Sequence, residues 1–244
     1  MKLVFASNNA HKLDEVRQIM PADVEVLSLS EIGFEQEIEE TGETLEANSE
    51  IKARTVAAFI GERLKVKGER IDGVFADDTG LEIDALGGKP GVYTARWYSR
   101  SHPSDMYQNP VLVGSPRALR SPQKLKFSGT PLTESEIFAA NRAKALQELK
   151  GETDRGAQFR TVITLILVER EKTALLKEKR TIQVSGIVRG RIAEEEYGQG
   201  GFGYDPVFIP EGYDKTFGEL PAEIKNSISH RSRALQALVK LLNS

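Results

Sequence analysis

The chain has 244 residues, of which 39% are hydrophobic and 28% are charged, and this composition is typical of a globular protein with a sizeable core. Its net charge is −3 with basic residues spread along the chain, which gives no sign of a nucleic-acid partner or a membrane surface. No apolar run approaches the ~20 residues that span a bilayer, and the absence of cysteine excludes disulfides and thiolate chemistry. We therefore expect a cytoplasmic protein without nucleic-acid or membrane partners.

The N-terminal segment predicts a strand, a polar turn and a helix. Residues 2–6 form a short apolar strand pattern, too short for the core of a signal peptide. After the turn Ser7–Asn9, apolar residues recur at helical spacing from Ala10. Such a turn points backbone N–H groups toward an anion, and a bound phosphate would offset the unfavourable position of His11 and Lys12 in the first helical turn. The segment is interpreted as a phosphate site or as a plain strand–helix connection.

A second strand and a helix follow, separated by an acidic stretch. Val24–Leu27 has the pattern of a strand, and residues 44–60 have that of a helix. Most carboxylates of the run Glu35–Glu40 are expected to face solvent. Glu39 or Glu40, at the junction with the helix, would be able to supply a metal ligand.

Two adjacent carboxylates follow an apolar run in residues 74–76. We predict a buried strand that delivers Asp77 and Asp78 into a tight turn at its carboxyl end, where ligand crevices of α/β sheets tend to lie. Neighbouring carboxylates repel, and a cation between them would relieve that repulsion; hard oxygen ligands favour Mg²⁺ or Mn²⁺. The alternative is an acidic surface turn, in which aspartate has its usual turn-forming role.

The middle of the chain is rich in glycine and proline. Residues 86–93 predict a constrained loop, suited to the close approach of a ligand. Residues 98–132 hold half of the chain's ten prolines and are basic, with weak periodicity. We predict a long irregular excursion there, either a solvated loop or a basic interaction arm.

Regular structure returns at Thr133, which forms a capping-box pattern with Glu136 at the start of a helix. The β-branched run in residues 159–168 predicts a central strand, and residues 181–192 predict another, with two internal glycines that indicate a bulge or bend. Because a charged turn separates these two strands, we expect a hairpin and hence a mixed sheet in an α/β protein.

Two C-terminal segments have the composition of ligand-binding loops. Residues 198–208 combine four glycines with Phe202, Tyr204 and Asp205, which would bring backbone and aromatic rings close to a flat ligand. The alternative is a glycine-rich hairpin loop. Farther on, Ser227 or Ser229 would cap the last helix and place the basic residues 230–231 at its N-terminal end, near Lys225, where an anion is favoured.

Five ordered segments resemble the motifs of the inosine triphosphate pyrophosphatase family, whose members remove non-standard purine nucleoside triphosphates such as dITP, ITP and XTP. The segments are Ser7–Lys12, Ala76–Leu81, Gly87–Arg96, Gly200–Pro206 and Ile228–Arg231. Together they span nearly the whole chain except residues 98–132, which look like an atypical insertion.

The resemblance implies a single pyrophosphatase domain over residues 1–244, with an elongated mixed β-sheet flanked by helices and two lobes around a central substrate cleft, in a homodimer. It implies Mg²⁺-dependent hydrolysis between the α- and β-phosphates, with Mn²⁺ as a substitute metal. The products are a nucleoside monophosphate and pyrophosphate, and the nucleotide pool is thereby cleansed.

The resemblance also implies roles for individual residues. Asp78 would be the metal ligand and general base, with Asp77 and Glu40 helping to place Mg²⁺ and water. Lys12 would supply charge to the phosphates, and Thr79 would touch the substrate where the family more often has serine. The phosphates would be held by Ser7, Asn8, Asn9, Ala10, His11 and Lys12; the base would be covered and read by Phe202, Gly203, Tyr204 and Asp205, with recognition completed by Lys225, His230 and Arg231.

One departure from the family pattern affects the metal site. The family usually has Glu-Asn where this chain has Ala47-Asn48, so the contribution of that glutamate near the metal is either absent or supplied by Glu43 or Glu46. Two alternatives therefore remain open, a nucleotide-binding protein without turnover and a pyrophosphatase for modified pyrimidine nucleotides. A general ATPase or kinase is disfavoured because the Walker and kinase signatures are absent.

Overall fold

The computed structural model describes residues 1–67, 70–101, 107–113, 126–170 and 176–242. The chain divides into two compact units, each described here by itself. Unit 1 comprises Met1–Glu82, Gln158–Arg189 and Pro221–Ser244, and unit 2 comprises Ile83–Ala157 and Gly190–Leu220. Within the described residues, no helix is long and apolar enough to cross a membrane.

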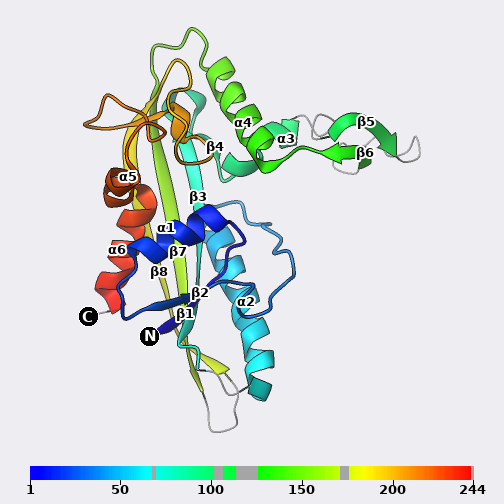
Figure 1. Cartoon of the computed structure of the whole chain (residues 1–244), viewed down its shortest axis with the longest axis vertical. Helices are drawn as coiled ribbons and strands as arrows, with labels where there is room; N and C mark the ends of the chain where they lie inside the picture. The colour runs from blue at the N-terminus through cyan, green and yellow to red at the C-terminus, as the bar shows by residue number, and fades with distance from the viewer. Residues whose placement is uncertain (68–69, 102–106, 114–125, 171–175, 243–244) are drawn as a thin grey trace. The chain divides into compact units, whose positions relative to one another are not determined.

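Unit 1 is a β-sheet covered by helices on both faces (Figure 1). Its strands are adjacent in the order β2-β1-β3-β7-β8, and β1 pairs in parallel with both β2 and β3. The strands are β1 (Lys2–Phe5), β2 (Glu25–Leu27), β3 (Gly73–Ile83), β7 (Gly156–Arg170) and β8 (Leu176–Ile192); the helices are α1 (Ala10–Ile19), α2 (Leu45–Lys67), α5 (Ala222–Ile228) and α6 (His230–Leu242).

The alternation of side chains along the strands builds a separate core on each face of the sheet. Leu3 and Phe5 of β1 pack against α1 and α6, whereas Val4 packs against α2. In β3, Phe75 belongs to the first core and its neighbours Val74 and Ala76 belong to the second. We refer to these surfaces as the α1/α6 face and the α2 face. The near-continuous apolar runs seen in the sequence follow from this two-sided burial.

A glycine of β8 allows α6 to approach the sheet closely. A Cβ atom on Gly186 would lie 2.1 Å from the carbonyl oxygen of His230 and 2.4 Å from the backbone nitrogen of Ala234. Any larger residue would therefore force the helix and the strand apart. Gly186 is one of the two glycines from which a bulge or bend was predicted. In a strand, glycine also marks places where another backbone comes close, and that is its role here.

Unit 2 contains smaller elements. They are β4 (Lys89–Gly91), α3 (Trp97–Ser101), β5 (Tyr107–Val113), β6 (Lys126–Pro131), α4 (Glu134–Glu148) and β9 (Phe208–Pro210). The buried side chain of Asn141 on α4 fastens this helix, because it accepts a hydrogen bond from the backbone of Tyr98 and donates one to the carbonyl of Ala95. Strand β9 pairs antiparallel with the last residues of β8, Gly190–Ile192.

The predicted mixed sheet flanked by helices is confirmed, as are the capping box of Thr133 and Glu136 and the cap of α6, where Ser229 Oγ accepts from the backbone of Ser232. Helix α5 was not predicted. The predicted tight turn at Asp77 and Asp78 is wrong, because β3 continues through both residues to Ile83.

The reason lies in the neighbouring strand. The parallel pairing of β1 with β3 reaches Phe75, after which β1 ends and the chain turns into α1. The carboxylates thus lie beside the carboxyl end of β1, while β3 itself runs on. The turn tendency of aspartate is overridden because both carboxylates find cationic partners on the helices that cover the sheet, Lys12 on α1 and Lys52 on α2.

The expectation of an irregular excursion over residues 98–132 also needs correction. Within it lie the end of α3 and a two-stranded antiparallel sheet of β5 and β6, whereas residues 102–106 and 114–125 lie outside the described residues. Pro110 falls where the register of β5 shifts, and Pro131 ends β6. Both strands are edges, where proline costs little pairing.

Candidate active site

The start of α1 is held by two side-chain caps. Ser7 Oγ accepts from the backbone nitrogen of Asn9 at 3.3 Å, and Asn9 Oδ1 accepts from the backbone nitrogen of Lys12 at 3.0 Å. The intervening side chains Asn8, Ala10 and His11 are exposed at this turn. The predicted strand, turn and helix start are therefore present, and a helix start of this kind directs backbone N–H groups outward, where an anion is favoured.

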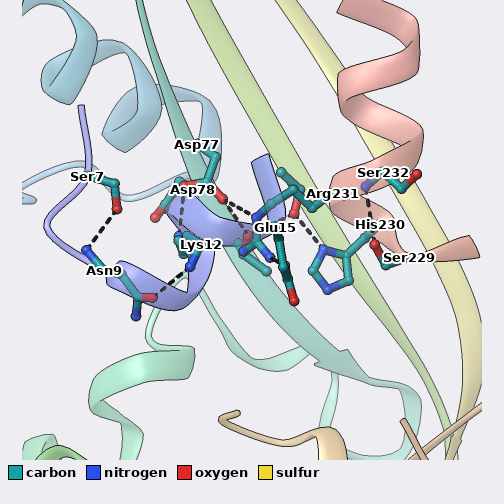
Figure 2. Close-up of polar contacts among 12 residues, drawn as sticks. Ser7, Asn9, Lys12, Glu15, Asp77, Asp78, Ser229, His230, Arg231 and Ser232 are labelled. Carbon is teal, nitrogen blue, oxygen red and sulfur yellow. Dashed lines mark hydrogen bonds and ion pairs between the residues drawn. The ribbon is translucent and has the colours of Figure 1, made fainter. Parts of the chain in front are cut away.

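Asp77 lies on the α1/α6 face of β3 and is fully engaged by two cations (Figure 2). Lys12 Nζ donates to its Oδ1 at 2.9 Å, and Arg231 Nε donates to its Oδ2 at 3.0 Å. Burial alone would raise the pKa of this carboxyl, but Lys12 and Arg231 outweigh burial and hold the pKa well below its ordinary value. Asp77 is thus held as an anion by the two basic side chains that it fixes.

Asp78 lies on the α2 face and has a different environment. Its Oδ1 accepts from Lys52 Nζ at 2.9 Å, and its Oδ2 accepts from Asn48 Nδ2 at 3.4 Å. Lys52 Nζ also donates to Glu40 Oε1 at 2.7 Å, so one ammonium group is shared between two carboxylates. Burial raises the pKa of Asp78 in spite of Lys52. The same two carboxylates keep the pKa of Lys52 raised although its burial opposes this.

The hypothesis that a cation lies between Asp77 and Asp78 is therefore wrong in this structure. Successive residues of a strand point to opposite faces, and each aspartate has its own lysine, Lys12 for the first and Lys52 for the second. The repulsion that a shared metal would relieve is removed by this separation instead.

Asp78 and Glu40 are nevertheless a fitting pair for a hard cation. Both offer carboxylate oxygens to a common position, now taken by the ammonium of Lys52. Within the described residues, no group of three or more acidic or histidine side chains is arranged to hold a metal. Two carboxylates without a closed cage suit Mg²⁺, which usually completes its coordination with water and substrate phosphates.

Lys52 and Glu15 are functional candidates that the sequence reasoning missed. Lys52 follows Asn48 by four residues and shares its helix face, and both are buried. Polar residues among the apolar ones on the core-facing side of α2 were the available signal. For Glu15, on α1, we see no comparable signal, because its partners lie more than 200 residues away in the chain.

Glu15 organises the basic residues near α6. Lys225 Nζ donates to Glu15 Oε1 at 2.7 Å. Arg231 Nη1 donates to the other carboxylate oxygen of Glu15, and Figure 2 shows these two side chains together. Burial would raise the pKa of Glu15, but Arg231 and Lys225 lower it below its ordinary value. Arg231 is thereby clamped between Glu15 and Asp77, with only 2% of its surface exposed.

His230 is buried beside Arg231 and is hydrogen-bonded through Nδ1. Thr161 Oγ1 lies 2.7 Å from this nitrogen, and Thr79 Oγ1 lies 2.7 Å from Thr161 Oγ1. The ring of Phe159 packs against the imidazole at a centroid distance of 4.8 Å. Burial, assisted by the positive charges of its neighbours, lowers the pKa of His230 well below its ordinary value, so the ring is neutral.

The predicted base-reading residues Phe202–Asp205 belong to unit 2. Asp205 Oδ2 accepts from the backbone of Phe202 at 2.7 Å, and the hydroxyl of Tyr204 donates to the carbonyl of Thr94 at 3.3 Å. Tyr204 and Asp205 are buried, whereas Phe202 is half-buried and faces Phe138. Asp205 and Tyr204 therefore shape the loop, and Phe202 is its more accessible ring.

The replacement for the glutamate missing at Ala47 is not found at Glu46. Its carboxylate is held by Arg160, whose Nη1 lies 2.5 Å from Oε1, and this hydrogen bond lowers the pKa of Glu46. Glu43 is exposed. Neither Glu43 nor Glu46 therefore adds a carboxylate to the cluster of Asp78, Lys52 and Glu40.

Comparisons with known proteins agree over the whole chain. A model of the Ham1 family matches residues 3–121 and 122–241. The dITP/XTP pyrophosphatase of Flavobacterium johnsoniae is 38% identical over 244 residues, covering 100% of this chain and 99% of that protein. The dITP/XTP pyrophosphatase of Bacillus subtilis is also 38% identical, covering 99% of this chain and 96% of that protein.

Solved structures show the same similarity. The Ham1 protein of Staphylococcus aureus superposes with a TM-score of 0.69 at 32% identity, covering 100% of this chain and 98% of that one. A HAM1 protein from Coxiella burnetii gives a TM-score of 0.70 at 29% identity, with the same coverage.

Proposed function

Because this chain belongs to the Ham1 family, we propose that it hydrolyses non-standard purine nucleoside triphosphates such as dITP, ITP and XTP to the nucleoside monophosphate and pyrophosphate. The observation that carries the proposal is the pair Asp77–Asp78, whose members contact different lysines on opposite faces of one strand beside the capped start of α1. Hydrolysis of these nucleotides would keep them out of the cellular pool.

The triphosphate would be bound by the turn before α1 and its first helical turn. Ser7 and Asn9 preserve the geometry of this turn, and Lys12 supplies the positive charge. Burial lowers the pKa of Lys12, with Asp77 acting against this change. A phosphate arriving beside the ammonium would add a second anion and stabilise its charged form. The exposed residues Asn8, Ala10 and His11 complete the proposed phosphate site.

Asp78 is proposed as the general base that orients the attacking water. A base works best when its pKa is close to the working pH, and burial moves the pKa of Asp78 in that direction. Asp78 and Glu40 would hold Mg²⁺, with Mn²⁺ as a substitute, and the metal would neutralise charge on the phosphates. Asp77 holds Lys12 and Arg231 in place, and the hydroxyl of Thr79 would touch the substrate.

Recognition of the base is proposed for residues of the C-terminal motifs identified in the sequence. We assign Phe202, Gly203, Tyr204 and Asp205 to covering and reading the base, and Lys225, His230 and Arg231 to completing recognition. Donors placed at a 6-oxo group would be left unpaired by an amino group, and this loss penalises canonical adenine nucleotides. A homodimer acting in the cytoplasm is part of the proposal, and light scattering of the purified chain tests the dimer.

Product analysis tests the activity. The purified chain is incubated with dITP, XTP, dGTP and dATP, with Mg²⁺ and with a chelator, beside the variants Asp78→Asn and Asp14→Asn. Asp14 is an exposed aspartate of α1 and serves as a matched control. We expect metal-dependent monophosphate and pyrophosphate from dITP and XTP, lost in Asp78→Asn and retained in Asp14→Asn.

Two other outcomes would replace the proposal. Tight binding of all four nucleotides without any product would identify a nucleotide-binding protein, and would direct attention to Ala47. Turnover of modified pyrimidine nucleotides in preference to dITP would keep the chemistry and change the substrate class.

A further inference from the structure

A buried chain of hydrogen-bonding groups connects Asp77 to the imidazole of His230. Thr79 on β3 and Thr161 on β7 lie on the α1/α6 face, and their hydroxyl oxygens are 2.7 Å apart. Thr161 is fully buried, and its oxygen is also 2.7 Å from Nδ1 of His230. At the other end, Thr79 Oγ1 lies 3.5 Å from Oδ2 of Asp77.

Two directions give each of the two 2.7 Å contacts a hydrogen and each hydroxyl hydrogen an acceptor within the chain, because a threonine hydroxyl carries a single hydrogen. In one direction, Nδ1–H of His230 donates to Thr161, Thr161 donates to Thr79, and Thr79 directs its hydrogen toward Asp77. In the other direction, Thr79 donates to Thr161 and Thr161 donates to a bare Nδ1. The second direction turns the oxygen of Thr79 toward the carboxylate.

Electrostatics selects the first direction. Asp77 is paired with Lys12 at 2.9 Å and with Arg231 at 3.0 Å, and a carboxylate held by two cations accepts hydrogen bonds and offers none. A substrate phosphate that reached Thr79 would likewise be an acceptor. A hydroxyl at the edge of such a site therefore points its hydrogen at the anion, and the remaining groups of the chain follow in sequence.

We infer that Thr161 is a positioning residue that holds His230 in the Nδ1–H tautomer, so that its Nε2 lone pair accepts a hydrogen bond from the N1–H of a 6-oxopurine base. Among the described residues, none hydrogen-bonds to Nε2 of His230. The inference rests on the proposed function for the identity of the ligand. Hypoxanthine, xanthine and guanine carry a hydrogen on N1, whereas adenine has a lone pair there. With the tautomer fixed, adenine would place one lone pair against another.

The tautomer can be observed directly in the free, full-length protein. In protein labelled with ¹⁵N-histidine, the chemical shift distinguishes a protonated from an unprotonated ring nitrogen. The chain has three histidines, and the signals that disappear in His230→Gln are those of His230. We expect a protonated Nδ1 and an unprotonated Nε2 for His230. A wild-type spectrum with the proton on Nε2 would overturn the inference without reference to any variant or activity.

Kinetics with Thr161→Val test the consequence. Valine keeps the shape of threonine and removes the hydroxyl, so the tautomer is released. We expect the ratio of kcat/KM for dITP over dATP to fall about tenfold, mainly through a higher KM for dITP, while Thr161→Ser restores both the ratio and the Nδ1–H signal. A Thr161→Val protein with an altered tautomer and an unaltered ratio would sink the specificity role.

Thr164→Val is the matched control. Thr164 is also a fully buried threonine of β7, but it lies on the opposite face, where its hydroxyl contacts Ser49 and Gln183. We expect its loss to leave the tautomer and the substrate ratio unchanged. Failure of the proposed function has a separate signature, namely no product from dITP in the wild-type protein, whatever tautomer the spectrum reports.

Discussion

Asp77 and Asp78 are neighbours of the same chemical type in one strand, yet their carboxyl groups are perturbed in opposite directions. Asp77 has two cations to itself, Lys12 and Arg231, and its pKa is lowered. Asp78 has Lys52, which it shares with Glu40, and its pKa is raised. Pairs of titratable groups whose environments move their pKa values apart mark the division between structural and acid–base roles. In the proposed mechanism, this division separates two residues that are one step apart along a strand.

Asp78→Asn should produce the largest change. A general base contributes about 100- to 10,000-fold to rate, so kcat for dITP should fall by about that factor, measured by pyrophosphate release. Because Lys52 keeps Glu40 as a partner, the free energy of unfolding should change little. An inactive variant that is also strongly destabilised would remove the distinction between the two aspartates.

Asp77→Asn should instead act on stability. The substitution leaves Lys12 and Arg231 short of an anion in a buried site, and breaking a buried ion pair costs about 3–5 kcal/mol. Urea unfolding followed by circular dichroism measures the loss, with Asp14→Asn as the exposed control. A loss no larger than that of the control would show that the pair Asp77–Arg231 has no structural role.

Lys52→Met tests whether Asp78 is the base that titrates in the pH profile of activity. The methionine removes the cation that opposes the effect of burial, so the pKa of Asp78 should rise further. An opposite charge at this distance lowers a carboxyl pKa by about 1–3. The acidic limb of the kcat/KM profile should therefore move toward higher pH by about that amount. An unmoved limb in an active variant would mean that Asp78 is not the titrating base.

The pH dependence of stability should give the smallest effect, with opposite signs for the two residues. The lowered pKa of Asp77 contributes stability that is present above its unfolded value, ~3.9, and is lost as pH falls through the folded value. The raised pKa of Asp78 makes its ionisation destabilising as pH rises from ~3.9 through the folded value. Relative to wild type, Asp77→Asn should become less unstable only as pH falls below ~4, whereas any gain in Asp78→Asn should already have disappeared near pH ~4.

Local patterns in the sequence were enough for much of the fold and for part of the site. Periodicity predicted strands β1, β2, β7 and β8 and the long helices, but not β5 and β6, and capping chemistry located Thr133 and Ser229 at helix starts. Lys12, Asp77 and Arg231 were named from motifs that the structure brings into direct contact. Each of these signals is contained in a few consecutive residues.

Pairings across long stretches of chain could not be predicted in this way. Glu15 contacts Arg231, which lies 216 positions away in the sequence, and Thr161 contacts His230, which lies 69 positions away, so no local spacing predicts either contact. The course of β3 through Asp77 was missed for the same reason. Its continuation depends on cations contributed by α1, α2 and α6 and not on the turn preference of aspartate.

The close contact between Gly186 and the first turn of α6 has a consequence for mutational scans. Because the position admits only a hydrogen atom, even alanine would lift the helix start that carries both His230 and Arg231. A scan scored by enzymatic turnover should therefore report residue 186 as intolerant, although glycine has no side chain with which to touch a nucleotide. Such a signal would measure how accurately α6 is seated on the sheet, and would be easily mistaken for a substrate contact.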